Sequence, residues 1–397
     1  MIRKEYPRLE NLYHYFHSHP ELSGKEEKTS HRIAGELEAL GLKVTRGVGG
    51  EGVVGLLENG KGPVILVRAD MDALPLREAT GLPYASQEIG VTHACGHDVH
   101  MTCLVGTAAV LTQMKNKWMG TLIFIAQPAE EKGEGAQAML EDGLFTRFPK
   151  PDYALALHVD SQLATGTIGY RRGPAFANVD SVDLTIYGRG GHGAYPHLAV
   201  DPIVIASEIV LALQTIPSRE LKPYETVVVT VGSLHGGTKH NIIPDQVKME
   251  LTIRSYAEEV RNQILEAIRR LATEIARAHR APRDPGMEVT ESIPSTYNDP
   301  ELVDRLLPVF RKTFGEENVI EKEPEMGGED FGLYGRAGVP AFLFRVGSVS
   351  PERIQESQKA GGRPLPSLHS AEYAPDPEPT ITSGIQAMVA AVLELLR

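Results

Sequence analysis

Cysteine and histidine residues gather in one short stretch, His93-Ala-Cys95-Gly-His97-Asp98-Val-His100. A single glycine separates Cys95 from His97, so the backbone can fold until the thiolate and an imidazole nitrogen reach a common point. Both groups are ligands suited to zinc and neighbouring transition metals, and Asp98 is a candidate for supporting a ligand from behind. Two alternatives stay open: a helix N-terminus with incidental histidines, and a cysteine nucleophile activated by a histidine.

Further acidic and histidine residues follow other apolar runs. Glu130 and Glu131 are adjacent, so their side chains leave the backbone in different directions. One carboxylate can therefore bind a metal while the other takes a proton from water. His158 ends another run, and His369 lies in a loop near the end of the sequence. Each residue alone has an ordinary structural explanation, but their joint occurrence favours a metal site with a free carboxylate.

Short, continuous apolar runs carry these residues and predict strands that are covered on both faces. Helical patterns over 8–19, 26–41 and 98–115 accompany the runs, which is typical of an α/β layer. Ligand sites of open α/β sheets lie outside the carboxyl ends of the strands. We therefore expect a mixed, largely parallel sheet flanked by helices, with the candidate residues at one edge; the runs are 53–57, 64–67, 122–126, 154–157 and 341–344.

The middle of the chain has a different pattern. Its elements alternate as β-α-β-β-α-β, the order of a ferredoxin-like α+β unit. We expect an inserted domain of residues 180–292 within a catalytic metal-binding domain of residues 1–179 and 293–397. The pattern consists of strands at 182–186, 226–234, 247–255 and 287–292 and helices at 200–216 and 257–280.

Composition excludes several classes of protein. The 397 residues are 42% hydrophobic and 23% charged, and 40 Lys+Arg against 52 Asp+Glu give a net charge of −12. No basic cluster is present, so nucleic acid and anionic membranes are not expected partners. No apolar run approaches the roughly 18 residues of a membrane span, and no secretory signal is recognisable, which predicts a cytoplasmic protein. Two cysteines exclude a disulfide framework.

Eight motifs, in order along nearly the whole chain, resemble one family of enzymes. It is the dinuclear-metal aminoacylase and carboxypeptidase family, in the amidohydrolase branch with hippurate hydrolases, plant auxin-conjugate hydrolases and N-acetyl-diaminopimelate deacetylases. The motifs are His17-Ser-His-Pro-Glu21, Arg68-Ala-Asp-Met-Asp-Ala-Leu-Pro75, His93-Ala-Cys-Gly-His-Asp98, Gln127-Pro-Ala-Glu-Glu131, Gly188-Arg-Gly-Gly-His-Gly-Ala-Tyr-Pro-His197, His240-Asn-Ile-Ile-Pro244, Gly327-Gly-Glu-Asp-Phe331 and Leu368-His369.

The resemblance implies roles for individual residues of the metal site. Two divalent ions are implied, and zinc, manganese, cobalt and nickel all accept thiolate, imidazole and carboxylate ligands. Glu130 matches the general base, and Asp72 matches the carboxylate that orients a ligand histidine, here His97. No catalytic role is assigned to Arg68, Asp70 or His100. The implied ligands are Cys95, which bridges the ions, with His97, Glu131, His158 and His369.

The same resemblance implies that the inserted domain is a lid that forms a homodimer. His192 matches a histidine that polarises the scissile carbonyl from the partner subunit. Asn241 and Arg254 match contacts to the substrate carboxylate, although an ordinary solvated arginine is the alternative for Arg254.

The implied activity is metal-dependent hydrolysis of an N-acyl amino acid, with an acetyl, benzoyl or arylacetyl group, to a carboxylic acid and an amino acid. Three alternatives stay open: a carboxypeptidase or dipeptidase on the same site, a non-catalytic metal-stabilised binding protein, and a cysteine-nucleophile hydrolase. The presence of Glu130, which has no ligand duty in this scheme, favours an enzyme.

Overall fold

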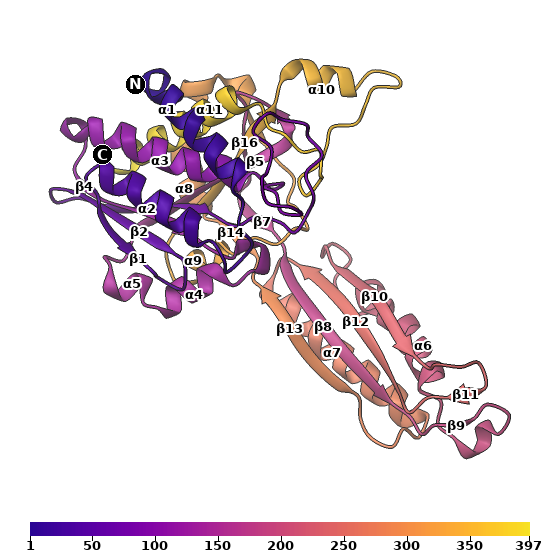
Figure 1. The fold of residues 1–397 in the computed structure, drawn as a ribbon. Coiled ribbons are helices and arrows are strands. Elements are labelled where there is room, and N and C mark those ends of the chain that lie inside the picture. The colour runs from indigo at the N-terminus through magenta and orange to yellow at the C-terminus, as the bar shows by residue number, and fades with distance from the viewer. The chain divides into compact units, whose positions relative to one another are not determined.

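The computed structural model describes residues 1–397 and separates into two compact units (Figure 1). The first unit comprises Met1–Ala175, Tyr297–Glu323 and Asp330–Arg397. The second, which we call the inserted unit, comprises Phe176–Thr296 with the short segment Pro324–Glu329. That segment is bound to the inserted unit by backbone contacts, including the Ala177 N–H to the Gly327 carbonyl at 3.1 Å.

An eight-stranded sheet forms the centre of the first unit. Its central strands β4, β3, β5 and β16 run parallel, while β1, β2 and β6 join them in antiparallel pairs. The predicted mixed, largely parallel sheet is thereby confirmed. In spatial order the strands are β1 (Lys43–Arg46), β2 (Val53–Asn59), β4 (Gly120–Gln127), β3 (Val64–Asp70), β5 (Tyr153–Ala164), β16 (Ala341–Val349), β6 (Ile168–Tyr170) and β15 (Val319–Glu321).

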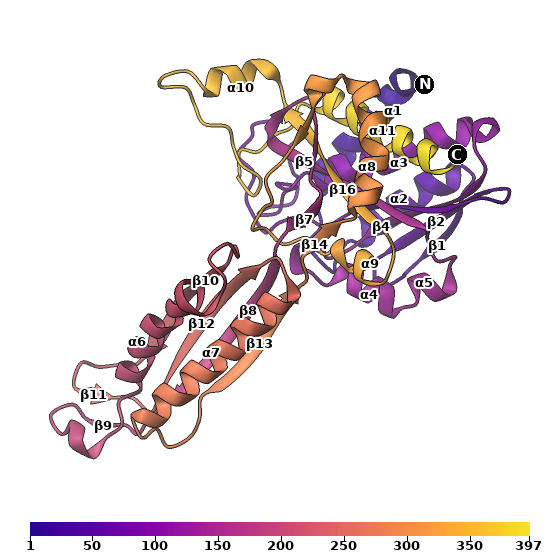
Figure 2. The same cartoon turned by 180° about the vertical axis from the view of Figure 1, so that it is seen from behind.

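Helices cover both faces of this sheet, which explains why its strands are apolar without alternation. Helices α1, α3, α8 and α11 pack together on one side, and the short α4, α5 and α9 lie on the other (Figures 1 and 2). Helix α3 is buried along nearly its whole length. The bounds are α1 (Ile2–Ser18), α2 (Glu27–Ala39), α3 (His97–Gln113), α4 (Gly135–Glu141), α5 (Leu144–Arg147), α8 (Pro300–Phe314), α9 (Gly332–Arg336), α10 (Pro351–Ser357) and α11 (Pro377–Leu395).

The inserted unit has its own hydrophobic core. Its antiparallel sheet has the order β10-β12-β8-β13, and α6 and α7 pack on this sheet, as in a ferredoxin-like unit. A short pair, β9 (Gly191–His192) with β11 (Ile242–Ile243), lies beyond one end of the sheet (Figures 1 and 2). The elements are β8 (Asn178–Tyr187), α6 (Pro202–Leu213), β10 (Val228–Gly236), β12 (Gln246–Ser255), α7 (Glu258–Ala278) and β13 (Gly286–Ile293).

Two small strands, β7 (Gly173–Phe176) and β14 (Thr296–Asn298), pair where the chain passes into and out of the inserted unit. Nowhere in the structure is there a helix with the length and apolar character that crossing a membrane requires.

Candidate metal centre

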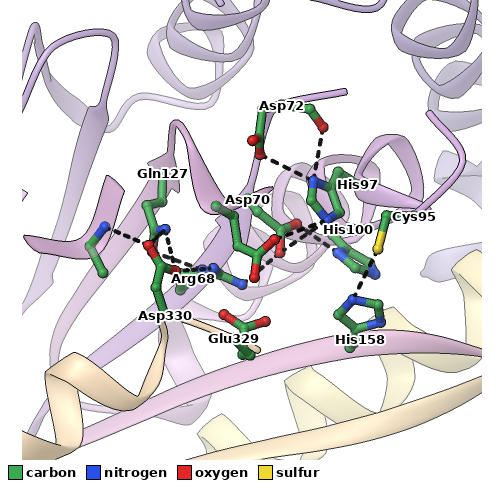
Figure 3. Close-up of polar contacts among 12 residues, drawn as sticks. Arg68, Asp70, Asp72, Cys95, His97, His100, Gln127, His158, Glu329 and Asp330 are labelled. Carbon is green, nitrogen blue, oxygen red and sulfur yellow. Dashed lines mark hydrogen bonds and ion pairs between the residues drawn. The ribbon is translucent and has the colours of Figure 1, made fainter. Parts of the chain in front are cut away.

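The carboxyl ends of three parallel strands bring the candidate residues of the first unit together (Figure 3). Asp72 lies just beyond β3, Glu130 and Glu131 follow β4, and His158 lies within β5. Helix α3 begins at His97 next to this edge. The convergence follows the general rule for open α/β sheets.

Gly96 sets the spacing between Cys95 and His97. Its φ of +84° lies in the left-handed region, and a Cβ at this position would stand 2.4 Å from Cγ2 of Val159. Any other residue would therefore be strained and would collide with β5. The glycine lets Cys95 and His97 face one point from opposite sides of a tight turn.

The predicted ligands form a ring of close donor atoms. The Sγ of Cys95 lies 3.6 Å from Nε2 of His158 and 3.3 Å from Nε2 of His369. Oε1 of Glu131 lies 3.5 Å from Nε2 of His369 and 3.9 Å from Nε2 of His97. Within each of the sets Cys95/His97/His158 and Cys95/Glu131/His369, all donor atoms are within 4.8 Å of one another. The two sets share Cys95, so a thiolate bridging two cations suits this arrangement.

The chemistry of the donors fits divalent cations. Nε2 of His97 and Oε1 of Glu131 are buried and have no hydrogen-bond partner, whereas buried polar atoms are normally satisfied. His158 donates from Nδ1 to the Val159 carbonyl at 2.8 Å, which directs its Nε2 lone pair toward Cys95. Thiolate, imidazole and carboxylate together are a donor set for zinc and its neighbours.

Burial, followed by the nearby Glu131 carboxylate, raises the pKa of the Cys95 thiol well above its usual value. A nucleophilic cysteine needs the opposite shift. A cysteine that binds a metal must be deprotonated, so binding of a cation would favour the thiolate form of Cys95.

Asp72 connects two of the ligand residues. Its backbone carbonyl accepts from Nδ1 of His97 at 2.9 Å, and its Oδ1 lies 3.3 Å from the same nitrogen. Its Oδ2 accepts the Glu131 N–H at 2.9 Å and the Ser23 hydroxyl at 2.7 Å. Burial acts against ionisation here, but the hydrogen bonds from His97 and Ser23 hold the pKa of Asp72 below its usual value. An ionised carboxylate behind a ligand imidazole fixes its tautomer and orientation. Ser23 was not identified from the sequence, because only the folded chain shows this contact.

A second buried network lies beside the ring. Arg68 binds Asp70 at 2.6 Å and Asp330 at 3.0 Å, and Gln127 also donates to Asp330 (Figure 3). Asp70 accepts from Nδ1 of His100 at 2.7 Å, and Nε2 of His100 accepts the Val159 N–H at 3.0 Å. These contacts link β3, β4 and β5 next to the candidate ligands.

Asp98 contacts His17 rather than one of the candidate ligands. Its carboxylate lies 2.7 Å from Nδ1 of His17 in α1, and His17 also contacts Glu78 at 3.3 Å. Although burial lowers it, hydrogen bonds to these two carboxylates raise the pKa of His17 to about 9. The expectation that Asp98 supports a ligand was wrong, because the first turn of α3 points this side chain toward α1.

The other predicted site residues belong to the inserted unit. His192 is exposed in β9, and its Nδ1 accepts the Ala194 N–H at 3.0 Å. His192 and Asn241 line the same surface pocket at the β9–β11 pair. Arg254 is half-buried at the other end of β12, where it donates to Thr252 and to the Met326 carbonyl. The inserted unit thus brings His192 and Asn241 together and places Arg254 apart from them.

Known proteins resemble this chain over most of its length. Residues 66–359 match the model of peptidase family M20/M25/M40. A hippurate hydrolase of Campylobacter jejuni is 38% identical over 85% of this chain and 87% of its own. Thermostable carboxypeptidase 1 of Saccharolobus solfataricus is 37% identical over 83% of each chain. A dinuclear metal-binding M20 peptidase of Bacillus subtilis superposes with a TM-score of 0.83, at 31% identity over 99% of both chains.

Proposed function

Since this chain belongs to peptidase family M20/M25/M40 and is a hydrolase of that family, we propose that it binds two divalent metal ions and hydrolyses N-acyl amino acids. The resemblance inferred from the eight motifs is confirmed by the family match. The observation that carries the proposal is the ring of five donor residues with Glu130 beside it, a buried carboxylate whose Oε2 lies 3.9 Å from Nε2 of His97 and to which this scheme assigns proton transfer. The donors are Cys95, His97, Glu131, His158 and His369.

The ions, when bound, polarise a carbonyl and lower the pKa of water from about 15.7 toward about 7. Glu130 takes the proton of the attacking water and passes it to the leaving nitrogen. Asp72 holds His97 in one tautomer and fixes the backbone of Glu131, so that both donors are arranged before any ligand arrives.

A metallocarboxypeptidase on the same site is the second candidate, favoured by the carboxypeptidase relative. The two activities differ in what precedes the cleaved bond, an acyl group or a peptide. The relative named hippurate hydrolase favours the acyl substrate, a benzoyl amino acid.

A turnover panel separates these functions. We expect hydrolysis of N-acetyl, N-benzoyl or N-indoleacetyl amino acids by protein loaded with zinc, manganese, cobalt or nickel, measured by release of the free amino acid. The matched controls are the same compounds with the carboxylate amidated, and dipeptides with a free N-terminus. Faster cleavage of peptides would establish the carboxypeptidase. If no compound were hydrolysed with any metal, a non-catalytic binding protein would be the better explanation.

We also propose that the inserted unit forms a homodimer and completes the partner's active site. Most of the exposed large apolar side chains of this protein lie between residues 195 and 242, on α6, β10 and the β9–β11 region. Exposed large apolar side chains are typical of interfaces where they form a contiguous patch. These side chains are Tyr195, Leu198, Ile203, Val204, Leu211, Tyr224, Leu234 and Ile242.

The positions of Asn241 and Arg254 support this proposal. Asn241 precedes β12 and Arg254 is its next-to-last residue; the strand runs from Gln246 to Ser255 and at about 3.3 Å per residue extends roughly 30 Å. One small carboxylate cannot touch both ends of such a strand. If both residues bind the substrate carboxylate, as proposed, they must come from different copies of the chain.

Mixing two inactive variants tests the shared site. We expect His192→Ala and Glu130→Gln homodimers to be nearly inactive. In their heterodimer, one of the two sites combines an intact metal centre with an intact His192, so activity should return towards half per heterodimer. Turnover is followed during subunit exchange.

Glu130→Gln mixed with Glu131→Gln is the matched control, because every chain then carries a damaged metal centre and no recovery is expected. If heterodimers of the first pair form and stay inactive, the shared site is wrong.

A further inference from the structure

The peptide before the two site glutamates is strained. Ala129 has φ 51° and ψ 39°, in the left-handed region, and it directly precedes Glu130. For a residue with a Cβ this conformation costs roughly 1–2 kcal/mol. The turn closes on itself, since the Ala129 carbonyl accepts the N–H groups of Glu134 and Gly135, both at 3.2 Å. Such strain persists where the surroundings impose it, and at functional sites it usually serves the geometry.

A carboxylate from another part of the chain holds this peptide. Oε1 of Glu26, just before α2, accepts the Ala129 N–H at 2.8 Å. Glu26 is 0% exposed, and its Oε2 is buried without a hydrogen-bond partner. Burying an acidic group this deeply is unfavourable unless a specific contact offsets it. The contact to the Ala129 N–H is the specific contact that the Glu26 carboxylate makes here.

The same short segment supports the ring at a second point. Ser23 donates to Asp72, which in turn contacts His97 and the Glu131 N–H. The Ala73 N–H also bonds to the Glu21 carbonyl at 2.8 Å. The side chains of Ser23 and Glu26 therefore support the two chain segments that present the acidic groups, those after β3 and after β4.

We propose that Glu26 is a positioning residue for hydrolysis. By accepting the Ala129 N–H, it holds the turn in the conformation that brings Oε2 of Glu130 and Oε1 of Glu131 each to 3.9 Å from Nε2 of His97. This inference rests on the proposed function, in which Glu130 moves the proton and Glu131 binds metal. The role requires a hydrogen-bond acceptor at the reach of a glutamate side chain, and it does not require a negative charge.

Two conservative substitutions distinguish the effect of side-chain length at position 26 from the effect of its charge. Glu26→Gln keeps an oxygen at the same distance from Ala129 and removes the charge, so we expect kcat within about threefold of the wild type. Glu26→Asp keeps the charge and is one methylene too short, so we expect kcat to fall about 10–100-fold, the scale of an ångström-sized misplacement. KM should change little. Assays use the full chain at saturating metal, with metal content and thermal midpoint recorded for each variant.

Glu21→Asp is the matched control. Glu21 lies in the same segment, and its carboxylate accepts the N–H groups of Lys28 and Thr29 at the start of α2. We expect a small loss of stability and an unchanged kcat. A Glu26→Asp enzyme as active as the wild type, or a Glu26→Gln enzyme more impaired than Glu26→Asp, would overturn the proposal. An inactive wild type, or a fully active Glu130→Gln variant, would instead overturn the proposed function.

Discussion

Glu130→Gln is expected to bind metal normally and to lose about 10²–10⁴-fold in kcat, the usual contribution of a positioned general base. The amide keeps the shape of the side chain but cannot take a proton. We expect Glu131→Gln to behave differently. Both carboxylates lie 3.9 Å from Nε2 of His97, but Oε1 of Glu131 also lies 3.5 Å from Nε2 of His369 and belongs to the donor set with Cys95. We expect this variant to lose mainly metal affinity. Metal titration of both proteins, followed by turnover at saturating metal, measures the difference.

The two variants serve as controls for each other, since they make the same chemical change at adjacent residues. If Glu131→Gln kept its metal and lost kcat while Glu130→Gln released metal, the proposed roles would have to be exchanged. Equal loss of metal from both would mean that neither carboxylate is free for proton transfer.

We expect chelation of the metal to abolish hydrolysis, and adding back a divalent cation to restore it. We expect up to two ions per chain by elemental analysis. Cys95→Asp should retain more activity than Cys95→Ala, because a carboxylate can still bridge two cations and a methyl group cannot. The expectation follows from the Cys95 Sγ, which belongs to both sets of donor atoms.

Cys103→Ala is the control for cysteine chemistry in general. Cys103 is buried in α3, where its thiol contacts the Ile381 carbonyl. Its replacement should leave metal content and the response to chelation unchanged. Full activity in metal-free protein would contradict the metal site. A Cys95→Asp variant with normal metal content and no more activity than Cys95→Ala would make a cysteine nucleophile the better explanation.

The fold was predictable because local patterns determine most of it. Unbroken apolar runs predicted the parallel strands, and alternation predicted the ferredoxin-like insertion. The residues at which helices and strands begin and end were harder to predict from the sequence. Helix α1 begins at Ile2, before the predicted residue 8, since Pro7 is tolerated inside it while Tyr6 and Leu9 pack into the core. Strand β5 continues to Ala164 through Asp160 and Ser161, which tertiary contacts bury.

The site was predictable only in part. Residue types and motif order pointed to Cys95, His97 and Glu131, and the structure places their donor atoms close together. Their supports could not be predicted from local sequence, because each joins distant segments. The pairs Glu26 with Ala129, Ser23 with Asp72, and Arg68 with Asp330 exist only once the chain has folded. The one signal in the sequence for these supporting residues was the presence of polar side chains within otherwise apolar stretches.

The chain enters and leaves the inserted unit at neighbouring positions. Strand β8 follows the entry and β13 precedes the exit, and these strands pair with Val179 opposite Ile293. Two cuts at adjacent points therefore separate Phe176–Thr296 from the rest of the polypeptide, and a short turn can rejoin the ends. The body of the ferredoxin-like unit is thus one contiguous segment whose two ends lie side by side. Recombination can exchange it, and with it the surface that we propose faces a partner, while the strand order around the candidate metal ligands stays as it is.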